Sequence, residues 1–175
     1  LLNSFPLDPG DDRLNLPGVR YVAMDGFGVN AKLFKAGKLD IVPAHFGDYG
    51  TIFEAGHLQP DVVLCTVTPA DDARRRSLGL TLDHIRDAME NARVVLAEES
   101  QAMPWTHGDA EISSDFLTAV FPAAHEPFPW EARPPGPVDH AIAEQVARLV
   151  PDGATVQYGV GATPDAVSYT HLRAH

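Results

Sequence analysis

The chain has 175 residues, 45% of them apolar and 21% charged, which suits one globular domain or a piece of a two-domain protein and excludes a disordered or fibrous chain. Its 13 Lys and Arg against 24 Asp and Glu give a formal net charge of -11, which disfavours nucleic-acid binding. One cysteine forms no internal disulfide, and no apolar run approaches the roughly 20 residues that span a bilayer, so we expect a soluble cytoplasmic protein without membrane contact.

The first predicted elements alternate between strand and helix. Residues 18–25 are rich in β-branched and aromatic side chains, which predicts a strand. A short helix over 30–38, with Asn30 as a candidate N-cap, and a strand over 39–42 follow. Asp48 can cap a further short helix.

Two apolar runs flank the clearest predicted helix. Residues 61–67 form a near-continuous apolar run, the pattern of a strand buried on both faces, and 93–97 form a second one. Between them, apolar side chains recur at three- and four-residue spacing from Leu82 to Ala92, with Thr81 placed as the N-cap. Strand, helix and strand in short succession imply right-handed crossovers, so we expect an α/β fold with a mostly parallel sheet and helices on both of its faces.

Proline changes the character of the chain between residues 122 and 137. Its frequency there is too high for a helix or a central strand, which indicates a linker. Beyond this segment, Ile142, Val146 and Leu149 form an amphipathic stripe, and residues 154–158 predict a strand after a tight turn. We expect this unit to begin a second α/β lobe.

A glycine turn between this predicted strand and the helix that follows is the strongest local candidate for a binding site. Its residues are Gly159, Val160, Gly161, Ala162 and Thr163. Two glycines let the backbone approach a ligand closely, and free N–H groups at a helix start can hold a phosphate or a developing oxyanion. On this pattern alone a structural tight turn is the favoured alternative, because G-x-G by itself is a weak motif.

Two further positions are candidates with a structural alternative. His45 lies at the carboxyl end of a predicted strand, the edge where α/β sheets place their sites. We interpret it as a possible site-edge residue, with packing of its ring on Phe46 or Tyr49 as the favoured alternative. The run Arg74-Arg75-Arg76 can grip a phosphorylated ligand, and a solvated loop is its favoured alternative.

Several other chemistries find no support in the sequence. Residues 106–109 include His107 and Asp109, but no second ligand recurs at a suitable spacing, so we expect a turn and no metal site. Cys65 lies in a predicted buried strand, where it acts as a small apolar residue. No G-x-S-x-G elbow supports a serine hydrolase, and Gly26-Phe27-Gly28 lacks the third glycine of a dinucleotide fingerprint.

Several stretches, taken together and in order, resemble a known family. They are VPAHFGDY (42–49), LQPDVVL (58–64), SLGLTLD (77–83), ARVVLAE (92–98), MPWTHGD (103–109), AIAE (141–144), LVPDGATVQ (149–157), GVGA (159–162) and PDAV (164–167). By these motifs the chain resembles the acetyl-CoA hydrolase and CoA-transferase family, which includes acetate and 4-hydroxybutyrate CoA-transferases.

The resemblance implies two similar α/β lobes with the active site between them. In this family a glutamate attacks the acyl-CoA thioester, and the acyl-glutamyl anhydride becomes a glutamyl-CoA thioester that a carboxylate or water resolves. The resemblance also implies that Gly159, Val160, Gly161, Ala162 and Thr163 form the loop that holds CoA. Coenzyme A or acyl-CoA is then a substrate, and no permanently bound cofactor is expected.

The resemblance also divides the chain. Residues 1–121 are expected to be most of a first lobe with a truncated start, 122–137 a linker, and 138–167 the start of the second lobe. Residues 168–175 depart from the family and resemble a translated adapter sequence, so we expect a non-native tail. The family's nucleophilic glutamate lies beyond the helix that begins near Pro164, so the resemblance assigns a catalytic role to no residue of this chain.

The sequence therefore predicts part of an enzyme that transfers CoA between an acyl-CoA and acetate or another short-chain acid, or that hydrolyses acetyl-CoA. The fragment itself is expected to be inactive. The alternative is a non-catalytic module that binds CoA or another phosphorylated ligand. The expected partners are an acyl-CoA and a small carboxylate, and a homodimer is left open.

Overall fold

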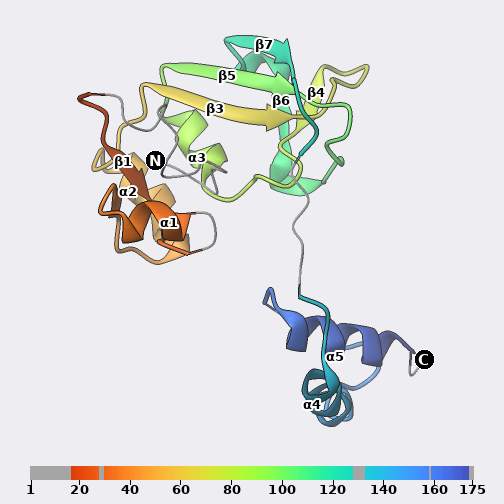
Figure 1. The fold of residues 1–175 in the computed structure, drawn as a ribbon. Helices are drawn as coiled ribbons and strands as arrows, with labels where there is room; N and C mark the ends of the chain where they lie inside the picture. Colours follow the sequence, from red (N-terminus) through yellow and green to blue (C-terminus); the bar gives the residue numbers. More distant parts are fainter. Residues whose placement is uncertain (1–16, 28–29, 128–132, 158, 174–175) are drawn as a thin grey trace. The chain divides into compact units, whose positions relative to one another are not determined.

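The computed structural model describes residues 17–27, 30–127, 133–157 and 159–173, which form two compact units, residues 1–127 and 128–175 (Figure 1). The strands are β1 (Tyr21–Ala23), β2 (Leu39–Ile41), β3 (Val62–Val67), β4 (Arg75–Ser77), β5 (Val94–Glu99), β6 (Glu111–Ser113) and β7 (Ala119–Pro122). The α-helices are α1 (Asn30–Lys35), α2 (Tyr49–Glu54), α3 (Ile85–Glu90), α4 (Pro137–Ala147) and α5 (Ala162–Arg173). Three short 3-10 helices are η2 (Phe46–Asp48), η3 (Gly108–Ala110) and η4 (Ser114–Phe116).

The described strands of the first unit form three small sheets. β3, β5 and β7 are parallel and lie in that order, with Leu64 beside Leu96 and Leu96 beside Ala119. β1 pairs in parallel with β2, and β4 runs antiparallel to β6. Parallel neighbours require crossover connections, and the one from β3 to β5 contains α3. The expected α/β class with a mostly parallel sheet is confirmed.

The main core lies between α3 and one face of the sheet formed by β3, β5 and β7, and Figure 1 shows α3 below β3. Side chains alternate between the faces of a strand, so every second residue of β3 and β5 points to this core. Its buried members are Tyr49, Phe53, Val63, Val67, Leu78, Ala88, Met89, Val95, Ala97, Ala110 and Ile112. A smaller cluster of Ala23, Leu33 and Leu39 packs α1 against β1 and β2.

Apolar side chains on β3 alternate between buried and exposed positions. Val62 is 47% exposed and Leu64 is 67% exposed, whereas Val63 and Val67 are buried. The prediction that residues 61–67 are buried on both faces is therefore wrong for the described part of the chain. The apolar run identified the strand correctly, but continuous hydrophobicity does not by itself show that both faces are covered.

The helix starts differ from the predicted caps. α3 begins at Ile85, and the hydroxyl of Thr81 donates instead to the Leu78 carbonyl at 2.9 Å, so Thr81 is not its cap. Asp48 does precede α2 as expected, but its side chain makes no capping hydrogen bond. Asn30 is the first residue of α1, and among the described residues its buried Oδ1 has no hydrogen-bond partner. In each case local turn geometry, which the sequence pattern does not contain, determines where the polar atom points.

The second unit packs α4 against α5. The buried residues of α4 are Asp139 and Ala143, whereas Ile142, Val146 and Leu149 are 44%, 37% and 81% exposed. The predicted stripe is therefore not the face that α4 buries in the described structure. Ala143, one helical turn after Asp139, is instead fully buried and lies on the covered face of α4.

The connection between α4 and α5 also differs from the prediction. Residues 154–157 form no strand, and Tyr158 lies outside the described residues. α5 begins at Ala162, close to the predicted start near Pro164, and continues through residues that we expected to be a non-native tail. Within the part of the chain that is described, none of the helices combines the length and apolar content needed to cross a bilayer.

Candidate functional site

The glycine turn at the start of α5 holds the five residues of the predicted binding loop. Ala162 and Thr163 are the first two residues of α5, and Gly161 accepts its first helical hydrogen bond, from the N–H of Asp165, at 3.0 Å. Gly161 has a φ of 153°, a conformation that is essentially restricted to glycine. The structure therefore requires the second glycine of the turn for a backbone reason. A structural turn alone would require it equally.

Asp139 of α4 is the main side-chain partner of this turn. Its Oδ1 accepts a hydrogen bond from the hydroxyl of Thr163 at 2.5 Å. Its Oδ2 accepts from the backbone N–H of Gly136 at 2.8 Å and from Nη2 of Arg133 at 3.0 Å. Asp139 is only 7% exposed, so its carboxylate joins the first turns of both helices in a largely buried position.

These donors stabilise the charged form of Asp139. The hydroxyl of Thr163 has the largest effect, followed by the N–H of Gly136, and together with Arg133 they lower the pKa of Asp139 to about 2. The carboxylate is therefore ionised at neutral pH. Sequence reasoning missed Asp139, although an acidic residue at the third position of a helix that begins with Pro137 is a recognisable start signal.

His45 belongs to the first unit and is exposed between β2 and η2. Its carbonyl accepts a hydrogen bond from the N–H of Asp48. The expected packing of its ring on Phe46 or Tyr49 is not found among the described residues, where those two rings contact each other at 6.5 Å. A role for His45 at the edge of a site stays a prediction.

Arg75 and Arg76 lie in β4, whereas Arg74 lies in the exposed bend before it, and all three guanidinium groups form ion pairs. Arg74 pairs with Asp115 at 3.0 Å, and Arg75 pairs with Asp71 at 2.8 Å. Arg76 pairs with Glu99 at 2.6 Å, and its side chain is only 11% exposed. The favoured interpretation as a solvated loop is therefore wrong for Arg75 and Arg76, but it agrees with the position of Arg74. These pairs, two of which join residues distant in sequence, also occupy the charges that a phosphorylated ligand would need.

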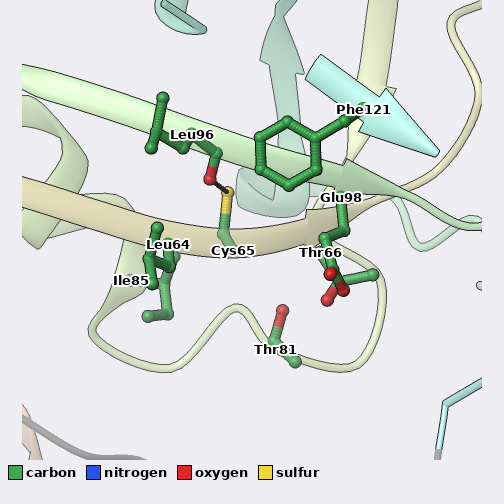
Figure 2. A pocket seen from close by; sticks show the side chains of 8 residues that line it. All are labelled: Leu64, Cys65, Thr66, Thr81, Ile85, Leu96, Glu98 and Phe121. Carbon is green, nitrogen blue, oxygen red and sulfur yellow. Dashed lines mark hydrogen bonds between the residues drawn. The ribbon is translucent and has the colours of Figure 1, made fainter. Parts of the chain in front are cut away.

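A cavity of about 450 Å³ opens beside β3 in the first unit (Figure 2). Its lining is mostly apolar and consists of Leu64, Cys65, Thr66, Thr81, Ile85, Leu96, Glu98 and Phe121. In Figure 2 the side chains of Thr66 and Glu98 lie together at one end, while the Cys65 sulfur points toward the Leu96 carbonyl, 3.9 Å away. Sequence reasoning missed this cavity because its walls come from three separate strands, the segment before α3 and the first residue of α3.

Cys65 is not an activated nucleophile. Burial raises the pKa of its thiol to about 11, so the thiol is protonated at neutral pH. This environment agrees with the interpretation of Cys65 as a small apolar residue.

Within the described ranges, no group of three or more His, Cys, Asp or Glu side chains is placed to hold a metal ion. His107 instead contacts a single carboxylate, with Nδ1 lying 2.7 Å from Oε1 of Glu111. Nε1 of Trp105 donates to the same oxygen at 3.3 Å, and these two side chains lower the pKa of Glu111. The segment after His107 forms the 3-10 turn η3, as the expectation of a turn required.

Residues 27–128 match the family model described as the acetyl-CoA hydrolase/transferase N-terminal domain. The chain is 35% identical over 150 residues to a 4-hydroxybutyrate coenzyme A transferase of Clostridium kluyveri, covering 85% of this chain and 34% of that protein. It is 36% identical over 137 residues to a succinyl-CoA:acetate/propanoyl-CoA:succinate CoA transferase of Fasciola hepatica, covering 78% of this chain and 29% of that protein. The chain thus spans about a third of the length of these relatives.

Two solved structures have similar folds. A 4-hydroxybutyrate CoA-transferase from Porphyromonas gingivalis superposes with a TM-score of 0.68 at 28% identity, covering 88% of this chain and 40% of that one. RipA from Yersinia pestis superposes with a TM-score of 0.77 at 26% identity, covering 86% of this chain and 37% of that one.

Proposed function

The chain belongs to the acetyl-CoA hydrolase and CoA-transferase family, and from that premise we propose that it is part of an enzyme that moves CoA between an acyl-CoA and a small carboxylate. Hydrolysis of acetyl-CoA is the outcome of the same chemistry when water takes the place of the carboxylate. The match to the family over residues 27–128 is the single observation that carries the proposal. The glycine turn at the start of α5 lies beyond that match and adds a candidate loop for CoA.

The proposed reaction proceeds through a glutamyl-CoA intermediate. A glutamate oxygen attacks the thioester carbon, the C–S bond breaks, and the CoA thiolate leaves an acyl-glutamyl anhydride. The thiolate then attacks the glutamyl carbonyl and releases the acyl group as a carboxylate, which leaves glutamyl-CoA for the acceptor acid or water. Each tetrahedral intermediate carries an oxyanion that needs hydrogen-bond donors.

Within this scheme we assign the turn Gly159, Val160, Gly161, Ala162 and Thr163 to CoA binding. The backbone N–H groups at the start of α5 are donors of the kind that a carbonyl oxygen of an acyl-CoA requires. The φ of 153° at Gly161 supports close approach of a ligand, because no side chain occupies that position.

The remaining assignments concern the chain as a whole. Residues 1–121 would contribute most of one lobe, 122–137 a linker and 138–167 the start of the next, with 168–175 as a non-native tail. The nucleophilic glutamate would not be among the residues of this chain, and His45 would lie at the site edge. A cytoplasmic location is consistent with the single cysteine, and the acceptor acid and a homodimer are left for experiment.

Purified chain 1–175 tests the absence of the nucleophile. We expect no conversion of acetyl-CoA to succinyl-CoA in the presence of succinate, followed by chromatography of the CoA esters, and no release of free thiol by hydrolysis, measured with a thiol reagent, each against a heat-treated sample. Sustained turnover by this chain would show that one of its own carboxylates is the nucleophile and would contradict the assignment.

Calorimetric titration with CoA tests the loop. Gly161→Val places a side chain in the turn, and Gly153→Val is the matched control because Gly153, an exposed residue outside the turn, also has a positive φ of 76°. We expect the first change to weaken CoA binding at least tenfold and the second to leave it unchanged. Equal affinities for the two variants would remove the loop from the proposal.

A non-catalytic module that holds CoA or another phosphorylated ligand is the alternative, because the chain contains the turn and no assigned nucleophile. CoA binding without turnover by the complete natural gene product would support this module. Turnover that stops when a single glutamate of that product is replaced by glutamine would support the enzyme.

A further inference from the structure

Apart from the bond with the Arg133 guanidinium, Asp139 makes one more hydrogen bond than the capping of its own helix needs. A carboxylate at the third position of a helix stabilises the helix start by accepting from the N–H of the capping residue, as Asp139 does from Gly136. The additional bond comes from the hydroxyl of Thr163, which lies 24 residues further along the chain. It connects α4 directly to the turn to which we assigned CoA.

This bond determines what Thr163 can offer to a ligand. A hydroxyl has a single proton, and the proton of Thr163 is directed at Oδ1 of Asp139 at 2.5 Å. The oxygen keeps its lone pairs and so can accept a hydrogen bond from a ligand. It cannot at the same time donate to a phosphate oxygen.

The charge around the turn also disfavours phosphate. The start of α5 carries a partial positive charge from its free N–H groups. The ionised carboxylate of Asp139 already lies against it, and Asp165 is in the first turn of the same helix. Residues 159–167 include no Lys or Arg, and Arg133 is paired with Asp139 at 3.0 Å. Asp139 and Asp165 would therefore repel a second anion such as a phosphate. They would not repel an amide, which is neutral and carries an N–H donor.

Resting on the proposed function, we propose that Asp139 is a positioning residue that fixes the Thr163 hydroxyl as an acceptor, so that the turn binds the amide-bearing pantetheine arm of CoA and not its phosphates. CoA contains both groups, and they can be offered separately. Pantetheine carries the two amides without any phosphate, and adenosine 3′,5′-bisphosphate carries phosphates without the amides.

The full chain 1–175, labelled with nitrogen-15, would be titrated with each probe while the backbone amides of Gly159, Gly161 and Thr163 are followed by NMR. We expect pantetheine to shift these amides and the bisphosphate to leave them in place. Thr163→Val should raise the dissociation constant for pantetheine at least fivefold, and Thr163→Ser should restore it. Thr155→Val makes the same chemical change at an exposed threonine and should have no effect.

Asp139→Asn separates positioning from a merely structural role. Loss of the charge should weaken pantetheine binding about threefold or more and should strengthen bisphosphate binding by a similar factor. A structural defect would weaken both. Bisphosphate shifts at the turn in the unsubstituted chain, or equal weakening of both probes by Thr163→Val, would overturn the proposal.

The ligand-free protein distinguishes this proposal from the CoA assignment on which it rests. Hydrogen exchange at the amide of Asp165, which donates to the Gly161 carbonyl at 3.0 Å, should become at least fivefold faster in Thr163→Val and stay unchanged in Thr155→Val and Thr163→Ser. Unchanged exchange in Thr163→Val would overturn positioning by Asp139. The other outcome is that exchange becomes faster in Thr163→Val, while neither CoA nor pantetheine shifts the amides of the turn in the unsubstituted chain. That result would overturn the CoA assignment and, with it, the choice of ligand.

Discussion

Arg76 and Glu99 form an ion pair of 2.6 Å that joins β4 to the carboxyl end of β5. The same guanidinium donates to the carbonyl of Thr68, directly after β3, at 2.9 Å and to the hydroxyl of Ser114 at 3.1 Å. One nearly buried side chain thus connects four segments where the parallel strands end.

Arg76→Gln should lower the free energy of unfolding by about 2 kcal/mol, because it leaves a partly buried Glu99 without its cation. Urea denaturation measures the change. Arg74→Gln is the control, since the ion pair of Arg74 with Asp115 is exposed on both sides and should contribute less than about 0.5 kcal/mol. Equal losses for the two variants would contradict the connecting role of Arg76.

Gly79→Ala should destabilise the protein by about 3 kcal/mol or more. Gly79 has a φ of 57°, and an added methyl group would overlap the buried side chain of Met103 and meet the carbonyl oxygen of Pro104 at 3.0 Å. Gly37→Ala isolates the backbone part of this cost, because Gly37 has a φ of 68° with open space around it, and about 1 kcal/mol is expected there. Thermal unfolding of the two variants gives the comparison, and similar melting temperatures would show that the contact with Met103 costs little.

His84 should make the protein less stable as the pH falls below about 6.5. Its ring is 4% exposed, lies against Tyr49 at 5.5 Å and stacks on Phe53 at 6.1 Å. Burial lowers the pKa of His84 from its ordinary value of 6.5, against the opposing effect of Asp83 and Asp87. At a pH between the two pKa values, His84 is protonated in the unfolded chain and neutral in the folded chain. The free energy of unfolding therefore decreases as the pH falls from the unfolded pKa toward the folded one.

Urea denaturation at pH 7.5 and pH 5.5 measures this effect. His84→Phe keeps the aromatic packing and should reduce the loss of stability between these two pH values by about 1 kcal/mol. His57→Gln removes an exposed histidine and should leave the loss unchanged. An identical pH dependence of the unsubstituted chain and His84→Phe would show that His84 is not the group responsible.

Cys65 should react with iodoacetamide about a hundredfold more slowly in the folded chain than in urea at pH 8. Partial burial raises the pKa of its thiol to about 11, which reduces the thiolate fraction by this factor. Because the sequence contains one cysteine, the mass of the intact protein reports this site alone. Equal rates in the folded and unfolded chain would contradict the buried position of the thiol.

The sequence predicts those elements whose signal is local. The apolar runs around Val63 and Val95 identified β3 and β5, and the spacing from Leu82 to Ala92 identified α3. β4 was missed because it begins with two arginines, whose charges are balanced by carboxylates distant in sequence, and β6, its antiparallel partner, was missed with it. Such pairing depends on the tertiary structure and leaves no periodic pattern.

The same division holds for the candidate site. The glycine turn was visible because Gly159 and Gly161 precede a helix start, and its assignment to CoA stays a prediction. The bond between Asp139 and Thr163 was not visible, since it spans 24 residues and depends on how α4 packs on α5. Ile142 and Leu149 belong to a predicted apolar helix face, yet both side chains are exposed. An amphipathic pattern does not say which neighbouring element, if any, covers the apolar face.

The carboxylate of Asp139 also affects how the first turns of α4 and α5 unfold locally. Helix ends commonly fray independently of one another, with little cost to the remainder of the fold. Here the first turns of α4 and α5 depend on one shared acceptor, so that loosening either end removes a stabilising bond from the other. Fraying, ordinarily a local event at each terminus, becomes a joint event of two helices.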